Sequence, residues 1–463
     1  MRSRGAILLV SCYELGHQPF HLASLCALLQ QAGYHPLPVD SAVETLADEA
    51  IRDARFVAIS VPMHTALRLG EQVARRVRAL NPAAHICFYG LYALLNAEYL
   101  LQGTIDSAIG GEYEGPLLNL LAALENGDSG AVVGAYTRGH ASGPWIQRTP
   151  FIVPERRSLP ALDRYARLEL NGTALLAGYT ETTRGCKHTC LHCPITPVYG
   201  GRFFAVPAAI VLADIRAQVA QGARHITFGD PDFFNGPTHA LRITRALHQE
   251  FPAVTFDATI KVEHLLKQRH LLPELKSLGC AFVVSAVESI NNTVLQRLDK
   301  GHDSADVAAV FDLMEQVGIP LRPSLLPFSP WETLDSYISL LCFIEERHLI
   351  EHIDPVHLSI RLLIPPGSAL LDAPDSAQWA GELDAAAYTY RWRHPDPRMD
   401  ALQADVAALV EEAEQRHADP VETFFQVKAL AFAAGGQAVA VAEAIAGYGS
   451  QKTLPHLSES WFC

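Results

Sequence analysis

Short apolar runs alternate with segments of helical periodicity over the N-terminal quarter of the chain. The runs AILLV (6–10), FVAISV (56–61) and HICFYG (85–90) have the length and composition of buried strands. Between them, residues 20–31 and 66–80 place apolar side chains at helical spacing. Strands that are buried on both faces and separated by helices predict a doubly wound parallel sheet. In such a sheet, ligands bind beyond the carboxyl ends of the strands.

A second stretch of strand–helix alternation begins near residue 173. Its apolar runs are TALLAGYTE (173–181), HITFGD (225–230), VTFDAT (254–259), AFVVSAV (281–287), PLRPSLL (320–326) and HLSIRLLI (357–364). Segments with helical periodicity separate most of these runs. Six strand–helix units predict a partial (β/α)6 barrel, whose chemistry belongs at the carboxyl ends of its strands.

The remaining segments differ in composition from these two units. Residues 127–172 are rich in Gly, Ser and Pro and show little periodicity, which predicts a linker packed on the surface. Residues 376–463 are rich in alanine and mostly helical in pattern, with a break at Gly435-Gly436. We therefore expect an α/β protein with a doubly wound domain over 1–126, the linker, a barrel over 173–375 and a helical C-terminal region.

Composition and charge exclude several classes of protein. Of the 463 residues, 49% are hydrophobic and 19% are charged, which is typical of a folded globular chain. The 36 Lys and Arg against 50 Asp and Glu give a formal charge of -14, which argues against a general electrostatic hold on nucleic acid or anionic lipid. The apolar runs are shorter than a membrane span, and the run after the basic N-terminus is too short for a signal peptide. We expect a cytoplasmic protein.

Three of the nine cysteines, Cys186, Cys190 and Cys193, stand close together in the chain. An odd number of cysteines in a large chain without a secretion signal argues against a disulfide framework. The spacing also suits a buried helical stripe, but the residues between the thiols are too polar for a core helix. A structural zinc site with His188 or His192 as the fourth ligand lacks the second ligand pair that such sites usually have.

The third interpretation is a [4Fe-4S] cluster on three thiolates, which leaves one iron free to bind a small molecule. The CxxxCxxC spacing after a barrel-type first strand resembles the radical S-adenosylmethionine (radical SAM) superfamily, although His192 stands where an aromatic residue is common. The resemblance implies that the free iron chelates the amino and carboxylate groups of SAM. It also implies that an electron, supplied by a flavodoxin- or ferredoxin-type donor, breaks a carbon–sulfur bond to form a carbon radical.

The same resemblance implies contacts with SAM at the ends of later strands. Gly229, Asp230 and Asp232 follow the second barrel strand, where the family has a Gly-Gly-Glu-like turn that contacts the SAM amino group. Ser285 and Glu288 end the fourth strand, where polar groups meet the SAM ribose or amino group. Turns and helix caps use the same residue types, so the order of these residues behind the cysteines makes them candidates.

A doubly wound domain ahead of such a barrel resembles the cobalamin-binding domain of B12-dependent radical SAM enzymes. The stretches AISVPMHT and AIGGEYEGPL are similar to that group, but the lower-ligand pattern Asp-x-His-x-x-Gly is absent. Bound cobalamin would therefore lack a protein histidine on cobalt. His17 and His64 lie at expected strand ends, where solvated histidines are common. Two expectations stay open: a domain that binds cobalamin, and a domain that keeps the fold without it.

The chain ends in HLSESWFC, with Cys463 as the last residue. This end resembles a subgroup of radical SAM proteins with a Cys-Cys-Ala-Glu-Pro or Cys-selenocysteine-Ala-Glu-Pro tail after a similar Ser-Trp-Phe stretch. A selenocysteine codon read as a stop would explain the missing remainder; a frayed terminus with a chance cysteine is the alternative. A thiol or thiol–selenol tail suits a soft, thiophilic atom, so Cys463 is a candidate for handling the acceptor.

These features predict a radical SAM enzyme that transfers a SAM-derived group to a small molecule. The tail subgroup includes the arsinothricin-biosynthesis enzyme, which moves a 3-amino-3-carboxypropyl group from SAM to arsenite. The leading hypothesis is therefore transfer to a thiophilic acceptor such as As(III). Cobalamin-dependent radical methylation of a small metabolite is the alternative. A third hypothesis is a sensor that binds a metal or cobalamin and catalyses no reaction.

Overall fold

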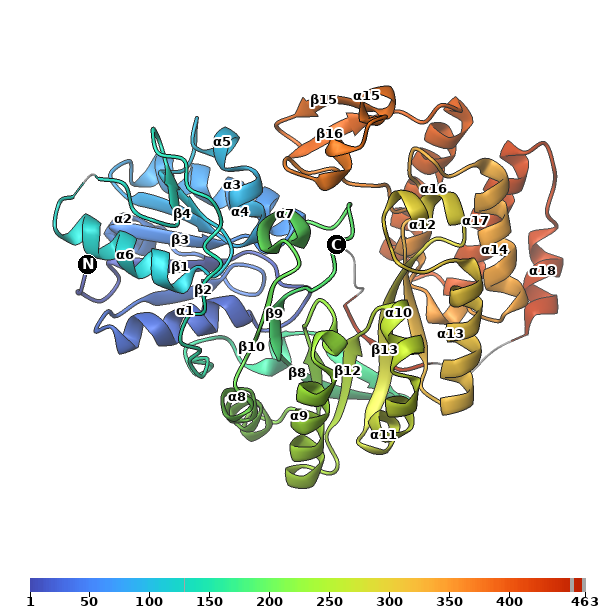
Figure 1. Ribbon diagram of the computed structural model, residues 1–463, viewed down its shortest axis with the longest axis horizontal. Helices are drawn as coiled ribbons and strands as arrows, with labels where there is room; N and C mark the ends of the chain where they lie inside the picture. Colours follow the sequence, from blue (N-terminus) through green and yellow to red (C-terminus); the bar gives the residue numbers. More distant parts are fainter. Residues whose placement is uncertain (129, 450–453, 460–463) are drawn as a thin grey trace.

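The computed structural model describes residues 1–128, 130–449 and 454–459. These residues form an N-terminal sheet flanked by helices, a second sheet that curls part of the way into a barrel, and a C-terminal helical layer (Figure 1). In the described part of the chain, every helix is too short or too polar to cross a membrane.

The first sheet is a doubly wound parallel sheet, as its apolar runs predicted. In sheet order its strands are Leu37–Asp40 (β2), Ile7–Ser11 (β1), Phe56–Ser60 (β3), His85–Tyr89 (β4), Ser107–Ile109 (β5) and Ala135–Thr137 (β6). The first five are parallel, and β6 pairs antiparallel with β5. Ligand crevices in this topology lie outside the carboxyl ends of the strands, where the strand order reverses between β1 and β3.

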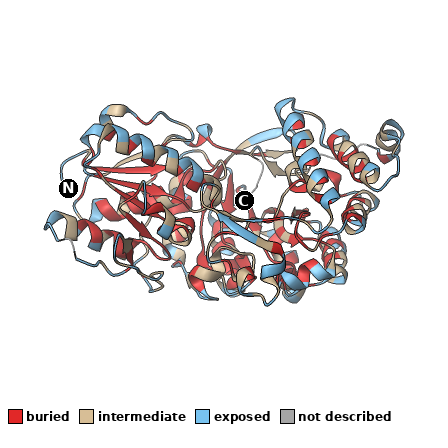
Figure 2. Ribbon diagram, turned by 90° about the horizontal axis from the view of Figure 1, so that it is seen from above, coloured by how far each residue is buried: buried red, intermediate tan, exposed pale blue. Residues whose placement is uncertain are grey.

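Helices cover both faces of this sheet. They are Phe20–Gln31 (α1), Asp48–Asp53 (α2), His64–Leu80 (α3), Leu91–Leu95 (α4), Ala97–Leu100 (α5) and Glu114–Glu125 (α6). Because successive strand residues point to opposite faces, Leu9 packs with side chains of α1 and α6, and Val10 packs with those of α2 and α3. Figure 2 shows the buried strands between helices whose outer faces are exposed.

The second sheet is an open half-barrel. In sheet order its strands are Leu321–Leu325 (β14), Cys280–Glu288 (β13), Thr255–Thr259 (β12), His225–Phe228 (β11), Thr173–Thr180 (β8), Arg167–Leu170 (β7) and His456–Leu457 (β17). The five strands from β8 to β14 are parallel, whereas β7 and β17 are antiparallel additions. Helices follow the parallel strands: Ala208–Ala220 (α8), Pro237–Glu250 (α9), Val262–Lys267 (α10), Leu272–Ser277 (α11), Asn292–Arg297 (α12), Ser304–Val317 (α13) and Leu334–Glu346 (α14).

Residues 357–364, expected as the sixth barrel strand, begin in the 3-10 turn Pro355–Leu358 (η5) and continue as chain outside any regular strand. They make a single bridge, between Arg361 and Phe328. Prolines on both sides of this segment lack a backbone N–H and restrict the residues before them, which limits strand pairing. The half-barrel therefore has five regular parallel strands and a sixth position held by irregular chain.

The segment expected as a surface linker, 127–172, contributes β6 to the first sheet and β7 to the second. Its Arg156 is only 2% exposed. The guanidinium forms an ion pair with Asp214 of α8 at 2.9 Å and donates to the Tyr179 carbonyl at 2.7 Å. Because a buried arginine is stable only with its partner in place, this pair fixes the segment against the barrel.

The C-terminal region is mostly helical, with a β-hairpin that periodicity missed. Its main helices are Pro397–Gln415 (α16), Pro420–Ala434 (α17) and Val441–Tyr448 (α18), and the break at Gly435-Gly436 separates the last two. The hairpin of Ala380–Asp384 (β15) and Thr389–Trp392 (β16) places Tyr388 in the core of the N-terminal domain. There the Ala387 carbonyl lies 2.7 Å from His64 Nε2.

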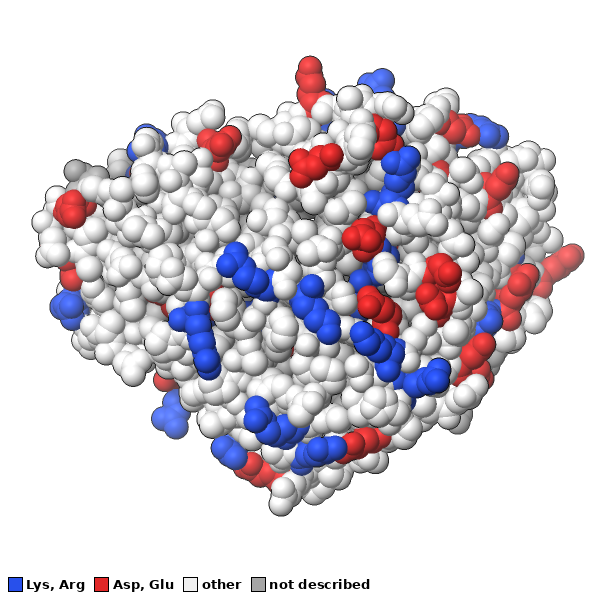
Figure 3. Space-filling model, in the orientation of Figure 1, with Lys and Arg blue, Asp and Glu red and all other residues white. Residues whose placement is uncertain are grey.

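Charged side chains are spread thinly over the face shown in Figure 3, most of which is uncharged. Some of the exposed charges in the described part of the chain form pairs, for example Arg216 with Glu250 at 2.6 Å and Arg245 with Glu274 at 2.6 Å. Solvent screens such pairs, so each contributes little to stability.

Candidate functional site

The three clustered cysteines lie in a loop at the carboxyl side of the half-barrel. Cys186 directly follows the short strand Thr183–Gly185 (β9), and Cys190 and Cys193 precede the helix Ile195–Tyr199 (α7). The Cys193 N–H donates to the Cys190 carbonyl at 3.2 Å, and the Thr196 hydroxyl donates to the same carbonyl at 2.8 Å. The backbone therefore sets the positions of the second and third thiols before any metal binds.

Asn235 holds the first turn of this loop from the neighbouring strand. It ends the 3-10 turn Phe233–Asn235 (η2) after β11. Its Oδ1 accepts from the Lys187 N–H at 3.2 Å, and its Nδ2 donates to the Gly185 carbonyl at 3.2 Å. Asn235 is a positioning residue that the spacing of the cysteines did not reveal.

The arrangement of the thiols suits a cluster better than a single zinc ion. Among the described residues, the one set of three ligand atoms close enough to share one ion is His188, Asp232 and His264, and it contains no thiol. In a polynuclear cluster each thiolate binds a different iron, so the sulfurs stand further apart. Burial raises the pKa of Cys186 to about 12 and that of Cys193 to about 11. These thiols are neutral at pH 7 without metal, and metal binding releases their protons.

Asp230, a predicted SAM contact, is buried at the end of β11 and supports the chain that leads to the cysteines. Its carboxylate accepts from the Thr182 N–H at 2.9 Å, the Thr182 hydroxyl at 2.7 Å and the Thr183 hydroxyl at 2.6 Å. Burial raises its pKa to about 6 in spite of these bonds. Thr182 and Thr183 therefore use most of the hydrogen-bond acceptor capacity of this carboxylate. Contact between Asp230 and SAM stays a prediction.

Gly229, another predicted SAM contact, leaves no room for a side chain. A Cβ at this position would lie 1.8 Å from the Tyr179 hydroxyl oxygen, and Tyr179 is packed against His17 of the N-terminal domain. We expect Gly229→Ala to displace the Tyr179 ring and to lower the free energy of unfolding by about 1–3 kcal/mol. Thermal unfolding of the variant and the parent protein measures the difference.

Gly447→Ala is the matched control for that substitution. Gly447 lies in α18, and no atom comes within 4 Å of the added methyl group. Because alanine favours helix, this change is expected to be neutral or to stabilise by up to about 1 kcal/mol. Equal effects of the two substitutions would contradict the close approach of Tyr179 to Gly229.

Glu288 lies beside the third cysteine, as part of a buried charge cluster. Lys300 Nζ is 3.0 Å from its Oε1, and His192 Nε2 is 3.3 Å from the same oxygen. Burial would raise the pKa of Glu288, but Lys300 and His192 hold it well below its usual value, so the carboxylate stays ionised. Glu288 has a left-handed backbone (φ 65°), which places it at an irregular strand end rather than within a regular ladder.

Ser285 precedes Glu288 on β13 and is fully buried. Its hydroxyl has no hydrogen-bond partner in the described part of the chain. A buried hydroxyl without a partner costs about 1–3 kcal/mol, so Ser285 keeps a donor and an acceptor for a bound molecule.

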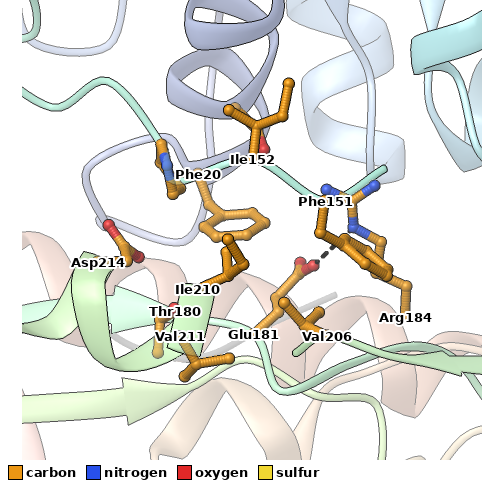
Figure 4. A pocket seen from close by; sticks show the side chains of 12 residues that line it. Phe20, Phe151, Ile152, Thr180, Glu181, Arg184, Val206, Ile210, Val211 and Asp214 are labelled. Atoms are coloured by element: carbon orange, nitrogen blue, oxygen red, sulfur yellow. Dashed lines mark ion pairs between the residues drawn. The ribbon is translucent and has the colours of Figure 1, made fainter. Parts of the chain in front are cut away.

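A second buried charge cluster joins the two domains next to the cysteine loop. Figure 4 shows two of its members, Arg184 and Glu181, facing each other in an ion pair. Arg184 of β9 is 6% exposed and forms ion pairs with Glu112 at 3.3 Å, with Glu181 at 3.5 Å and with Glu114. Glu112 and Glu114 come from the loop after β5 and the start of α6. Burial raises the pKa of Glu181 to about 7, against the opposing effect of His21 and Arg184.

Glu112 contacts both ends of the cysteine loop. Its Oε2 pairs with Arg184, two residues before Cys186, and its Oε1 accepts from the Tyr199 hydroxyl at 2.9 Å. Tyr199 is the last residue of α7, the helix that follows Cys193. One carboxylate at the carboxyl edge of the N-terminal sheet therefore positions the whole loop.

Histidines at this edge are already engaged by protein groups. His17 lies against the Tyr179 ring with centroids 4.8 Å apart, and burial lowers its pKa to about 4. His21 is paired with Glu181 at 3.5 Å, and His64 is held by the hairpin carbonyl. These three histidines are thus each in contact with another protein group.

Partly exposed apolar side chains line the same edge. They are Leu15 after β1, Pro62 and Met63 after β3, and Leu91 after β4. A corrin presents a broad, largely apolar face, so these residues fit cobalamin held by packing without an axial imidazole.

The described tail also reaches this edge. Strand β17 pairs with β7, and the Tyr13 hydroxyl, just after β1, donates to Glu459 at 2.9 Å. Glu459 packs on Gly16, where a Cβ would lie 2.7 Å from the glutamate side chain. Cys463, the candidate acceptor ligand, lies outside the described residues.

Part of the chain is similar to known proteins. Residues 180–341 match the family described as Radical SAM superfamily. The chain is 26% identical over 214 residues to the ribosomal protein uS12 methylthiotransferase RimO of Geobacter sulfurreducens, covering 42% of this chain and 48% of the relative. It is 22% identical over 325 residues to hopanoid C-3 methylase of Methylococcus capsulatus, covering 68% and 62%. The chain thus spans about half of these relatives' length.

Solved structures share the fold of both domains. The cobalamin-dependent S-adenosylmethionine radical enzyme OxsB, with aqua-cobalamin bound, superposes with a TM-score of 0.70 at 14% identity, covering 92% of this chain and 72% of that one. The radical SAM methyltransferase TsrM from Kitasatospora setae, with tryptophan and a SAM analogue bound, gives 0.66 at 15% identity, covering 88% and 89%. Residues 180–341 therefore match a superfamily that uses a [4Fe-4S] cluster and SAM, and the fold is similar to that of cobalamin-dependent radical SAM enzymes.

Proposed function

We propose that this radical SAM protein is an enzyme that cleaves SAM reductively and methylates a small metabolite with the help of cobalamin. The observation that carries the proposal is the packing of the carboxyl edge of the N-terminal sheet against the cysteine loop, through Glu112, Arg184 and Tyr199. A carrier bound at that edge would lie close to SAM on the cluster. The likeness in fold to OxsB and TsrM and the sequence similarity to a methylase and a methylthiotransferase support it.

The chain's own residues would hold the reactants as follows. Cys186, Cys190 and Cys193 each bind one iron of the cluster, and the fourth iron binds SAM. Glu288, kept ionised by Lys300 and His192, offers a buried carboxylate to the amino group or ribose of SAM. When bound, the cluster supplies the electron that cleaves the sulfonium, and cobalamin supplies a carrier for the methyl group. An external flavodoxin- or ferredoxin-type protein would provide the electron.

A second candidate reaction is transfer of the 3-amino-3-carboxypropyl group of SAM to a thiophilic acceptor such as As(III), with Cys463 as its ligand. One observation favours it: residues 454–459, which lead toward Cys463, pair with β7 and contact Tyr13 at the carboxyl edge of the N-terminal sheet. A soft thiol carried by this tail suits trivalent arsenic.

Product analysis separates the two candidates. Anaerobically reconstituted protein is reduced in the presence of SAM, with and without added cobalamin, and the SAM-derived products are measured by mass spectrometry. Methylation predicts S-adenosylhomocysteine and 5'-deoxyadenosine, both dependent on cobalamin and substrate. Aminocarboxypropyl transfer predicts methylthioadenosine instead, with no dependence on cobalamin. If the cluster is complete and no SAM is consumed with either class of acceptor, both proposals are wrong and a sensor is favoured.

A further inference from the structure

Two imidazoles and one carboxylate converge beside the cysteine loop from three separate segments. His188 is in the loop itself, Asp232 follows β11, and His264 is on α10. Asp232 Oδ2 is 3.2 Å from His188 Nε2 and 2.6 Å from His264 Nδ1. All three atoms lie within 4.8 Å of one another, and the two imidazole centroids are 4.6 Å apart.

These three atoms are buried and have no hydrogen-bond partner in the described structure. The side chains of Asp232 and His264 are each 2% exposed. The atoms are close together, but their geometry does not satisfy a hydrogen bond. The other oxygen of Asp232 is used, since it accepts from the Phe234 N–H at 3.0 Å. Each unsatisfied buried polar atom costs about 1–3 kcal/mol, so three that converge on one point indicate a shared ligand.

We propose that His188, Asp232 and His264 bind one divalent transition-metal ion that is distinct from the iron–sulfur cluster. Two imidazole nitrogens and a carboxylate oxygen are a donor set that suits Zn²⁺ or Fe²⁺. Three protein ligands leave at least one coordination position for water or for an oxygen donor of a small molecule. The assignment stands independently of the proposed reaction.

The surrounding charges fit a cation held by neutral imidazoles. Lys261 Nζ lies 3.3 Å from His188 Nδ1, and Glu263 Oε2 lies 3.8 Å from the same nitrogen. Lys261 and Glu263 are paired with each other at 3.4 Å, so their charges offset. When His188 Nε2 binds a metal, its Nδ1 carries a proton and becomes a donor. Lys261, which can only donate, would then turn from Nδ1 to its ion-pair partner Glu263, whose Oε2 is placed as an outer acceptor for Nδ1.

A metal at this point would connect three parts of the barrel. His188 lies between the first two cluster cysteines, whereas Asp232 and His264 belong to the segments after β11 and β12. The ion would therefore hold the middle of the cysteine loop to the barrel, where Asn235 and Thr196 hold its two ends.

The test measures zinc in the full-length protein after anaerobic reconstitution of the cluster. Zn²⁺ is added, unbound ion is removed by gel filtration, and iron and zinc are counted per chain by mass spectrometry. We expect one zinc per chain beside an unchanged iron content. X-ray absorption at the zinc edge is expected to show nitrogen and oxygen neighbours at about 2.0–2.2 Å and no sulfur at about 2.3 Å.

Substitution of the ligands identifies the site. Asp232→Asn and His264→Gln keep side-chain size and are expected to lower zinc affinity more than the ~10–100-fold typical of an outer-shell change. His270→Gln is the matched control, because His270 is an exposed histidine of the adjacent 3-10 turn Arg269–Leu271 (η3). It should leave zinc binding unchanged.

Three results would overturn the proposal: no zinc retained by the parent protein, zinc with sulfur neighbours, or zinc bound equally well by the ligand variants. The first two are read on the parent protein, so they decide the question even where a variant fails to assemble its cluster. With any of these results, His188, Asp232 and His264 would support the loop through contacts with one another and without a metal ion.

Discussion

Cys190→Ala is expected to abolish the iron–sulfur cluster and, with it, all cleavage of SAM. Cys190 is the most buried of the three clustered cysteines. Its backbone carbonyl accepts hydrogen bonds from the Cys193 N–H and from the Thr196 hydroxyl. Two thiolates hold a [4Fe-4S] cluster poorly. The absorbance near ~400 nm should disappear, the iron content should collapse, and SAM turnover should fall by more than the ~10–100-fold typical of an outer-shell change.

Cys342→Ala is the matched control for this loss. Cys342 is a half-buried free cysteine of α14, remote in sequence from the loop and outside every proposed ligand set. It should retain the parent's iron content and turnover. A Cys190→Ala protein with parental iron content and turnover would contradict the cluster assignment, whatever the effect at Cys342.

Arg184→Met is expected to destabilise the protein by about 3–5 kcal/mol. The change removes the buried cation that faces Glu112, Glu114 and Glu181. Among their described partners, Glu112 keeps only the Tyr199 hydroxyl and Glu181 only His21, and uncompensated charge is costly in a low-dielectric interior. The thermal midpoint of unfolding should fall by about 3–5 °C, because a chain of 463 residues has an unfolding entropy of about 1 kcal/mol/K. Iron occupancy after reconstitution should fall as well, because Arg184 stands two residues before Cys186.

The control is Arg216→Met, which removes an ion pair of similar length on the surface. Arg216 and Glu250 are 2.6 Å apart, but their side chains are 50% and 36% exposed. Solvent already screens this pair, so the thermal midpoint should change far less than in Arg184→Met. If both arginine variants unfold at the same temperature, the buried cluster does not join the domains in the way described.

Local patterns predicted most of the elements that lead to the site. The stretch 20–31 is helix α1 with the predicted ends, and the apolar runs at 56–61 and 225–230 contain β3 and β11. The strands are buried on both faces and the helix is buried along one stripe. The spacing of their apolar residues therefore reveals the type of element directly. The cysteine loop was identified from spacing alone, because a cluster requires its ligands close together in the chain.

The residues that the pattern missed are those that only tertiary structure brings to the site. Lys300 follows helix α12, and His264 lies on helix α10. Neither residue stands in a recognisable sequence motif. Asn235 supports the cysteine loop from the neighbouring strand, 50 residues after Gly185 in the chain. Arg184 had one local signal, its place between the barrel strand and the first cysteine, but its carboxylate partners come from another domain. The hairpin β15–β16 is too short and too exposed for periodicity to detect.

The double contact of Glu112 bears on how this protein is made. Synthesis runs from the N-terminus, so the doubly wound domain that carries Glu112 leaves the ribosome well before the cysteines do. Apart from Tyr388, which the later hairpin adds to its core, that domain can be in place when the nascent loop emerges, and it then offers a template on which the loop folds. A fragment that begins at the barrel would have to shape its own iron ligands without that template. The two halves are therefore not interchangeable modules: grafting either onto a foreign neighbour would forfeit iron loading.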